Sequence, residues 1–335
     1  MEVILAEHLG FCYGVKRAIE IARENASPDG TSSTLGPIIH NPQMVERLKE
    51  EGVGTVSTLD EMQDGTVIIR SHGVGPAVYA QAEQRGLNLV DATCPHVKKA
   101  QLSAKQLSEE GYTVVIIGEK NHPEVKSIFE WTAQQAHIIE SEEEAAALPT
   151  FGKLGVVCQT TFSSDRFRRI ASVLLDKSRD IKILRTICTA TDMRQSAAIE
   201  LAGRVDAMIV VGGKNSANTM RLAQLCSEKC RTYHIETADE LQSDWLNHIN
   251  KIGITAGAST PDWIIKEVFK QCQSRALRNF WNRKICPISK SAPWSKGLLS
   301  RYPAMRRMWI LATSRKFLSP RGILPFLRRT MHATS

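Results

Sequence analysis

The sequence predicts an α/β protein made of three small modules, each with a mostly parallel sheet. Over residues 1–274, short β-branched runs alternate with longer helical patterns, and this alternation is typical of parallel sheets covered by helices. A cysteine also recurs in a short loop before a helical pattern, at Cys12, Cys94 and Cys188. The separations of 82 and 94 residues each correspond to about one small α/β unit. We therefore expect three modules, each presenting one thiol near the start of a helix.

The individual elements follow from local patterns. Apolar residues at i, i+3, i+4 and i+7 predict helices around residues 15–22 and 167–174. Runs rich in β-branched residues predict strands at 3–6, 66–70, 113–117, 155–158, 207–211 and 252–255. We expect modules at 1–95, 96–187 and 188–274, followed by a basic extension at 275–335 that is poorly ordered.

Charge is distributed unevenly along the chain. All 35 acidic residues lie at or before Glu267, with 28 Lys and Arg, and the remaining 15 Lys and Arg follow it. The body therefore gives no reason to expect binding to nucleic acid or to a membrane. The extension alone is basic enough to bind RNA or anionic lipid, and the competing interpretation is a dispensable, unstructured end.

Composition and the N-terminus indicate a cytoplasmic protein. Apolar residues make up 42% and charged residues 23% of the chain, which is ordinary for a globular protein, and no apolar run is long enough to span a membrane. The first residues lack the pattern of a signal peptide. Because the cytoplasm keeps thiols reduced, the eight cysteines are expected to be ligands or buried residues.

Cys12, Cys94 and Cys188 have the setting of metal ligands. A thiolate at a helix N-terminus is stabilised by exposed N–H groups, glycines flank Cys12, and Pro95 suits the first position of a helix. Three thiolates on an iron–sulfur cluster would leave one iron open for a substrate. Spacing alone does not exclude zinc, and a lone cysteine is more often a small buried side chain. We give that last interpretation to the other five: Cys158, Cys226, Cys230, Cys272 and Cys286.

Polar loops follow several predicted strands. His40 in IIHNP, His72 in RSHGVGP and His122 in NHPEV lie where strands end, which is where open α/β sheets bind ligands. Ser216, Asn218 and Ser259 occupy similar loops before helices. Each of these alone is usually only a helix cap, but together they form the neutral donor set that suits a diphosphate. The chain has neither a P-loop nor a dinucleotide-binding glycine motif.

A carboxyl group adjoins this set. Glu124 lies two residues after His122, and Thr160 follows the predicted strand at 155–158. Near a metal centre such a pair can move protons. The alternative is an ordinary first-turn glutamate stabilised by the helix dipole.

The order of the motifs resembles one known family. GFCYGVKRA, IIHNPQMV, SHGV, DATCP, NHPEV, QTT, the run from Cys188 to Gln195, KNSAN and TAGAST are similar to the motifs of the IspH (LytB) family, over about residues 1–274. The resemblance implies a reductase that converts (E)-4-hydroxy-3-methylbut-2-enyl diphosphate to isopentenyl and dimethylallyl diphosphate. This two-electron dehydroxylation is the last step of the non-mevalonate isoprenoid pathway. The implied fold is three modules in pseudo-threefold symmetry around a central cavity.

The resemblance also implies roles for individual residues. Cys12, Cys94 and Cys188 would bind three irons of one [4Fe–4S] cluster per chain, and the fourth iron would bind the substrate hydroxyl. Glu124, Thr160 and His122 would be catalytic. An electron-donor protein such as ferredoxin or flavodoxin would be the partner. The implied diphosphate-binding residues are His40, His72, His122, Thr160, Ser216, Asn218 and Ser259.

The chain departs from the family pattern at one binding segment. Ala217 stands where some members carry Ser, so one phosphate donor is missing. Two other classes of function compete with the reductase: a non-catalytic module with structural zinc, and an RNA- or membrane-associated protein that binds through its basic extension.

Overall fold

The computed structural model describes residues 1–246 and 249–284. It divides into two compact units, Met1–Ala276 and Leu277–Ser335, and the strands of the described residues all lie in the first. Most of the predicted basic extension, 275–335, lies outside the described residues. Helix α10 (Asp262–Lys284) continues into its first residues.

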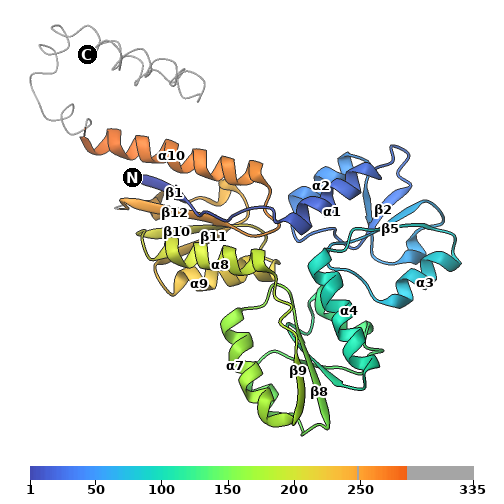
Figure 1. Cartoon of the computed structure of the whole chain (residues 1–335). Helices are drawn as coiled ribbons and strands as arrows, with labels where there is room; N and C mark the ends of the chain where they lie inside the picture. The colour runs from blue at the N-terminus through green and yellow to red at the C-terminus, as the bar shows by residue number, and fades with distance from the viewer. Residues whose placement is uncertain (247–248, 285–335) are drawn as a thin grey trace, which may run out of the picture. The chain divides into compact units, whose positions relative to one another are not determined.

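Three four-stranded parallel sheets form the first unit (Figure 1). The first sheet has the order β3 (Gly54–Val56), β2 (Ser32–Leu35), β4 (Thr66–Ile69), β5 (Asn88–Asp91). The second has the order β7 (His137–Ile139), β6 (Thr113–Ile117), β8 (Lys153–Cys158), β9 (Asp180–Ile183). The third has the order β11 (Arg231–Ile235), β10 (Ala207–Val211), β12 (Lys251–Ala256), β1 (Glu2–Leu5).

One topology is repeated in all three sheets. If the strands of each sheet are numbered along its own module, their spatial order is second, first, third, fourth. In the third sheet the fourth place is taken by β1, which pairs in parallel with β12 from Glu2↔Lys251 to Leu5↔Ile254. The expected α/β class with three parallel-sheet modules is therefore confirmed, and the N-terminal strand completes the sheet of the last module.

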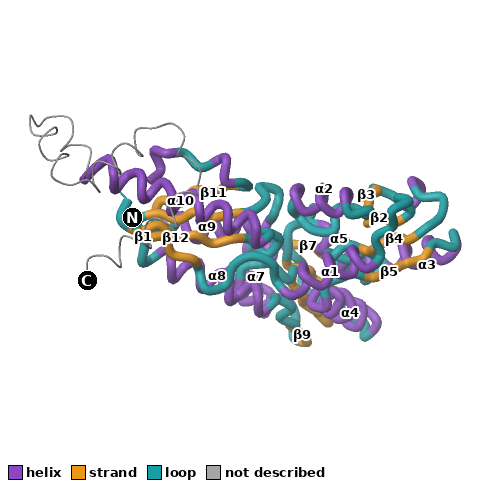
Figure 2. The backbone as a smooth tube through the Cα atoms, turned by 90° about the horizontal axis from the view of Figure 1, so that it is seen from above, coloured by secondary structure: helices purple, strands orange, loops and turns teal. Residues whose placement is uncertain are grey.

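Figure 2 shows the helices in purple between the strands, and several of them start at clear sequence signals. Proline occupies the first turn of α2, α3, α4 and α5, where a missing N–H costs nothing. The bounds are α1 (Tyr13–Glu24), α2 (Pro42–Glu50), α3 (Pro76–Gln84), α4 (Pro95–Glu109), α5 (Pro123–Glu130), α6 (Glu142–Ala147), α7 (Ser164–Leu174), α8 (Thr189–Ala202) and α9 (Ala217–Ser227). Short 3-10 turns lie at Leu59–Glu61, Leu175–Lys177, Ala238–Glu240 and Ser243–Leu246.

The helix after each fourth strand packs on the next sheet. Helix α1 follows β1 of the third sheet, but its buried face packs with Ile68 of the first sheet. Helix α4 follows β5 of the first sheet and packs with Val114 and Val157 of the second. Helix α8 follows β9 of the second sheet and packs with Met208 of the third. The three modules are thus joined in a cycle, and each joint lies in the loop before one of these helices.

Side chains alternate between the two faces of the sheets. On β10, Ile209 packs in a cluster with α10, whereas Met208 and Val210 pack with α8 and α9; Figure 1 shows α10 on one side of the third sheet and α8 and α9 on the other. This is the two-sided coverage that all-parallel sheets require. A search of the described helices for a segment able to cross a membrane finds none.

Candidate active site

The three predicted thiols occupy equivalent positions at the joints between modules. Cys12, Cys94 and Cys188 are the N-cap residues of α1, α4 and α8. Each follows the fourth strand of a sheet, and each is a free, partly exposed thiol. The prediction that each cysteine directly precedes a helix is therefore confirmed.

The same loops bring the sulfur atoms near one another. A Cβ atom added to Gly14 of α1 would lie 2.4 Å from Sγ of Cys94, so only glycine permits this approach. Burial raises the pKa of Cys94 to about 11, nearby backbone N–H groups lower it, and the charges of Cys12 and Cys188 raise it further. Burial also raises the pKa of Cys188, and Cys12 adds to this effect. Three thiols that oppose one another's ionisation form a site that favours a bound cationic group.

The sulfur-only donor set suits an iron–sulfur cluster. In such a cluster each iron takes its own thiolate, so three thiols from three separate loops can bind three irons. A single zinc ion bound by cysteine sulfurs at about 2.3 Å would need the same thiols to converge on one point.

A buried carboxyl group adjoins the Cys188 loop. Glu124, 2% exposed, accepts hydrogen bonds from Thr160 N at 2.6 Å and Thr160 Oγ1 at 2.8 Å. The carbonyl of Thr160 in turn accepts from Cys188 N at 2.9 Å. Burial raises the pKa of Glu124 to about 7, although the Thr160 hydrogen bonds oppose the shift. A carboxyl group that titrates near neutral pH is suited to donating a proton.

Three histidine rings from two modules meet. The ring centroids of His40 and His72 lie 4.3 Å apart, and each lies 5.6 Å from that of His122. Their loops follow β2, β4 and β6. The sequence predicts that each of the three lies where a strand ends, although β2 itself is not among the predicted strands. His122 is the N-cap of α5, and its Nδ1 accepts from Glu124 N at 3.2 Å, so a neutral ring carries its proton on Nε2 and can donate there.

Burial keeps these rings neutral. It lowers the pKa of His122 to about 3, that of His72 well below its usual value, and that of His40 as well. The guanidinium of Arg70 lowers all three further. The rings lie close enough to share a metal ion, but the neighbouring positive charge of Arg70 opposes binding of a cation and favours an anion.

Several buried polar atoms around the histidines lack a partner. Among the described residues, His40 Nε2, His72 Nδ1 and both amide atoms of Asn218 are buried without a hydrogen bond. Such atoms are costly unless a ligand or water satisfies them. Their number here indicates a site that is completed by a ligand rich in hydrogen-bonding oxygen atoms.

The third module reaches the same region. A Cβ on Gly213, after β10, would lie 3.0 Å from the carbonyl oxygen of His40. Ser216, three residues on, is buried and accepts from Thr219 N at 3.4 Å as the N-cap of α9. Ser259 is partly exposed in the turn after β12, beside Ala258, whose carbonyl accepts from Cys12 N at 3.2 Å. The predicted binding residues therefore lie in loops that contact the histidine loop or the cysteine loop.

Two arginines, Arg194, which is buried, and Arg70, which is partly buried, were not among the predicted site residues. Arg194 of α8 is 4% exposed and donates through Nη2 to the carbonyl of Gly10 at 2.7 Å, and through Nη1 to that of Ala190 at 3.1 Å. It thereby ties the loop of Cys12 to the helix of Cys188. Arg70 ends the first sheet's central strand beside the histidines. The signal for Arg194 was its place in the motif run after Cys188.

The cysteines given a structural interpretation have ordinary surroundings. Cys158, Cys226 and Cys272 are buried in apolar clusters, and Cys230 is partly buried. Cys286 lies outside the described residues.

Comparison with known proteins agrees with this arrangement. The family model described as LytB protein matches residues 3–273. A relative from Geobacter sulfurreducens, named 4-hydroxy-3-methylbut-2-enyl diphosphate reductase, is 52% identical over 274 residues, which cover 82% of this chain and 97% of the relative. A relative of the same name from Geotalea uraniireducens is 49% identical, with the same coverage.

Two solved structures are also similar. One, described as (E)-4-hydroxy-3-methyl-but-2-enyl diphosphate reductase, the terminal enzyme of the non-mevalonate pathway, is 44% identical with a TM-score of 0.63, covering 82% of this chain and 100% of that one. The other, E-1-hydroxy-2-methyl-but-2-enyl-4-diphosphate reductase from Plasmodium falciparum, is 30% identical with a TM-score of 0.74, covering 85% and 89%.

Proposed function

The chain belongs to the LytB protein family, and we propose that it is a 4-hydroxy-3-methylbut-2-enyl diphosphate reductase. The reaction breaks the C–O bond of an allylic alcohol, consumes two electrons and two protons, and releases water. Protonation of the allylic fragment at one of two carbons gives isopentenyl or dimethylallyl diphosphate. This is the last step of the non-mevalonate pathway to isoprenoids.

The observation that carries the proposal is the meeting of three helix-capping thiols beside a buried, protonatable carboxyl group. Cys12, Cys94 and Cys188 supply a sulfur-only donor set, and Gly14 leaves room against Cys94. This set fits one [4Fe–4S] cluster with three protein ligands. When bound, such a cluster supplies electrons and one iron that polarises the C–O bond of the substrate.

Glu124 acts as the proton donor in this proposal. Its pKa of about 7 means that a large share of the molecules hold a proton on it at neutral pH. Thr160 fixes the carboxyl group through two hydrogen bonds, and the Thr160 carbonyl joins that pair to the Cys188 loop. The acid is thereby kept next to the thiol site, where hydroxide must leave as water.

The histidine loops bind the diphosphate. His40, His72 and His122 are neutral donors, and their unsatisfied nitrogens, with the amide of Asn218, can be paired by phosphate oxygens. Ser216 and Ser259 add hydroxyl groups from the third module. Binding the diphosphate away from the reacting carbon supplies orientation, which lowers the barrier without direct contact with the breaking bond.

Anaerobic purification of the full chain tests the proposal. We expect about four iron and four sulfide per chain, together with turnover of the allylic diphosphate when reduced methyl viologen supplies electrons. Cys12→Ser should lose the cluster and turnover, whereas Cys230→Ser, a partly buried thiol away from the joints, should keep both. A colourless protein with stoichiometric zinc and no turnover would contradict the proposal and support a structural metal site.

The proposed electron donor is a one-electron carrier protein such as ferredoxin or flavodoxin, and the proposed location is the cytoplasm. Two successive one-electron transfers would complete each turnover. Turnover and folding of a chain truncated after residue 284 would test whether the basic extension is dispensable.

A further inference from the structure

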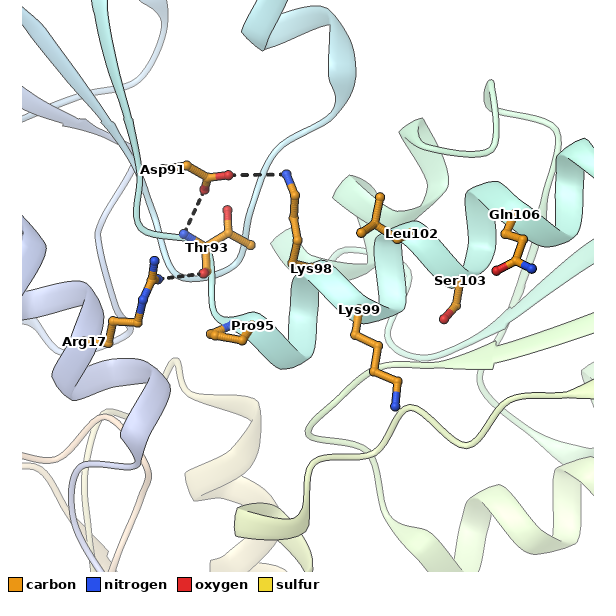
Figure 3. A pocket seen from close by; sticks show the side chains of 9 residues that line it. All are labelled: Arg17, Asp91, Thr93, Pro95, Lys98, Lys99, Leu102, Ser103 and Gln106. Carbon is orange, nitrogen blue, oxygen red and sulfur yellow. Dashed lines mark hydrogen bonds and ion pairs between the residues drawn. The ribbon is translucent and has the colours of Figure 1, made fainter.

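A basic hollow lies on the outer side of the Cys94 loop. Its volume is about 480 Å³, and it lies between α1 and the first turns of α4 (Figure 3). We call this site the basic hollow, and the residues that line it include Arg17, Asp91, Thr93, Pro95, Lys98 and Lys99.

The hollow and the thiol site share one loop. Thr93 and Pro95 line the hollow, and they are the two sequence neighbours of Cys94. Gly14, whose Cβ would lie 2.4 Å from Cys94 Sγ, is three residues before Arg17 on α1. Arg17 Nη1 donates to the carbonyl of Thr93 at 3.1 Å, as Figure 3 shows. The protein between this part of the surface and the sulfur of Cys94 is therefore a single loop.

The charge of the hollow is opposite to that of the body. It contains three cations and one anion, and the anion, Asp91, is already paired with Lys98 at 3.3 Å. Within the described residues, Arg17 and Lys99 have no carboxylate within ion-pair distance. The chain up to Glu267 carries more acidic than basic residues, so this positive region is local. Leu102 adds an apolar side chain that is 47% exposed at the same hollow.

We propose that the basic hollow is the docking site of an acidic one-electron carrier protein that reduces the cluster. The proposal rests on the reductase function above. Unpaired cations around an exposed apolar side chain match the usual pattern of an interface with an acidic partner. Electron transfer slows steeply with distance, so a carrier gains most by docking where one loop separates it from a cluster ligand. In each encounter the carrier loses one electron and the cluster gains one, and two encounters serve each substrate.

The site also leaves the substrate loops free. The histidine and serine residues proposed to bind diphosphate come from loops after the first and third strands, whereas the hollow adjoins a loop after a fourth strand. A carrier at the hollow therefore need not displace the substrate, and both can be bound during turnover.

The test measures turnover of the full-length holoenzyme with two different sources of electrons. An acidic flavodoxin is the protein donor, and reduced methyl viologen is the small donor that needs no docking site. Arg17→Glu with Lys99→Glu should lower kcat/KM for flavodoxin by about tenfold or more at low ionic strength, and leave turnover with methyl viologen within about twofold. The difference should shrink at high salt, because screening shortens the range of the charges.

A matched variant controls for net charge. Lys229→Glu with Lys266→Glu changes the same number of positive charges, at exposed residues just after α9 and on α10, and should leave the flavodoxin rate close to that of the unaltered chain. Equal rates for the two double variants would overturn the docking proposal. If Arg17→Glu disturbs folding, Lys99→Glu alone decides, since Lys99 is exposed.

Two further outcomes separate this proposal from others. An unaltered flavodoxin rate, combined with loss of thermal stabilisation by inorganic diphosphate in the Arg17/Lys99 variant, would assign the hollow to a small anion and overturn the proposal. Absence of methyl viologen turnover in the unaltered chain would instead contradict the reductase function itself.

Discussion

Two sets of loops in the three modules differ in how far they repeat. The loop after each fourth strand carries a cysteine, whereas the loops after the first and third strands carry side chains that vary from module to module. The fourth-strand loops all carry a cysteine at a helix N-cap. After the first strands come His40, His122 and Ser216, and after the third strands come His72, Thr160 and Ser259.

This difference separates two tasks. A centre held by three equivalent thiols has no preferred direction for a substrate. The unequal loops supply one, because histidines from two modules gather on one side and Glu124 is fixed by Thr160 alone. The fold repeats itself where a cluster is to be held and differs where an asymmetric molecule is to be oriented.

The largest effects should come from the equivalent positions, and they should be equal. Cys12→Ser, Cys94→Ser and Cys188→Ser are each expected to remove the cluster and abolish turnover, since each removes one of three protein ligands. Iron content per chain and turnover check this. A single variant that kept its iron and its activity would show that the three joints are not equivalent.

Next in size is Glu124→Gln, at a position with no equivalent in the other modules. We expect kcat to fall by about 10²–10⁴, the usual contribution of a positioned general acid, with iron content unchanged. Glu119→Gln is the matched control, a partly buried carboxyl of the same module that lacks the Thr160 contacts. Because the protonated form is required, activity should be full below the Glu124 pKa of about 7 and fall as pH rises through it. If the variant lost activity with rising pH in the same way as the unaltered chain, Glu124 would not be the group whose titration causes that loss.

Arg194→Gln tests the joint between Cys12 and Cys188. The change leaves the buried carbonyl of Gly10 without this donor, which costs about 1–3 kcal/mol, and removes the partly buried hydrogen bond to the carbonyl of Ala190. Faster loss of iron on dilution and a lower thermal midpoint of the apoprotein are the expected results. Arg204→Gln, an exposed residue just after the same helix, should change neither, and equal behaviour of the two variants would remove Arg194 from this role.

A smaller effect concerns the acid stability of the histidine loops. The pKa of His122 falls from 6.5 in the unfolded chain to about 3 in the fold, and that of His72 also falls. The unfolded chain therefore binds more protons between these values, so stability should decrease as pH falls below about 6.5. Between pH 7 and pH 5, the thermal midpoint of His72→Gln should drop less than that of the unaltered chain. Inorganic diphosphate should raise the thermal midpoint of the unaltered chain at pH 7, where the rings are neutral donors, and should raise it less for His72→Gln. No stabilisation of the unaltered chain at pH 7 would refute an anion site.

The smallest effect should come from Ala217→Ser at the start of α9. A hydroxyl group there adds one donor beside Ser216 and Asn218, and we expect KM to fall by about twofold or less, the scale of a single exposed hydrogen bond. Steady-state kinetics with the allylic diphosphate would detect it. A rise in KM would mean that the added hydroxyl group interferes with the present arrangement of that loop.

Local patterns in the sequence predicted much of the fold. The strands at 113–117 and 207–211 have the predicted bounds, because continuous β-branched runs are typical of buried parallel strands. β2 was not among the predicted strands: its residues Ser32, Ser33 and Thr34 are polar yet buried, and hydropathy carries no signal for that. The place of β1 in the third sheet depends on a partner about 250 residues away, which no local pattern contains.

The candidate site was predictable for a different reason. Parallel sheets place the ends of their strands on one edge, so loop residues after strands were sound candidates even without the pairing. Arg194 was not a candidate because charged residues in helices are usually solvated. Arg194 is buried because α8 packs on the third sheet, the sheet of the next module. That contact exists only once the modules have assembled, so no local sequence pattern predicts it.

The position of β1 has a consequence for how the protein is made. The first strand to leave the ribosome pairs with β12, which is synthesised after nearly all of the body, so this ring of modules closes only late in synthesis. Until then the loop of Cys12 lacks its contact with Ala258. Under the proposed function, iron would therefore meet an incompletely anchored set of thiols on a chain whose β12 has not yet been made.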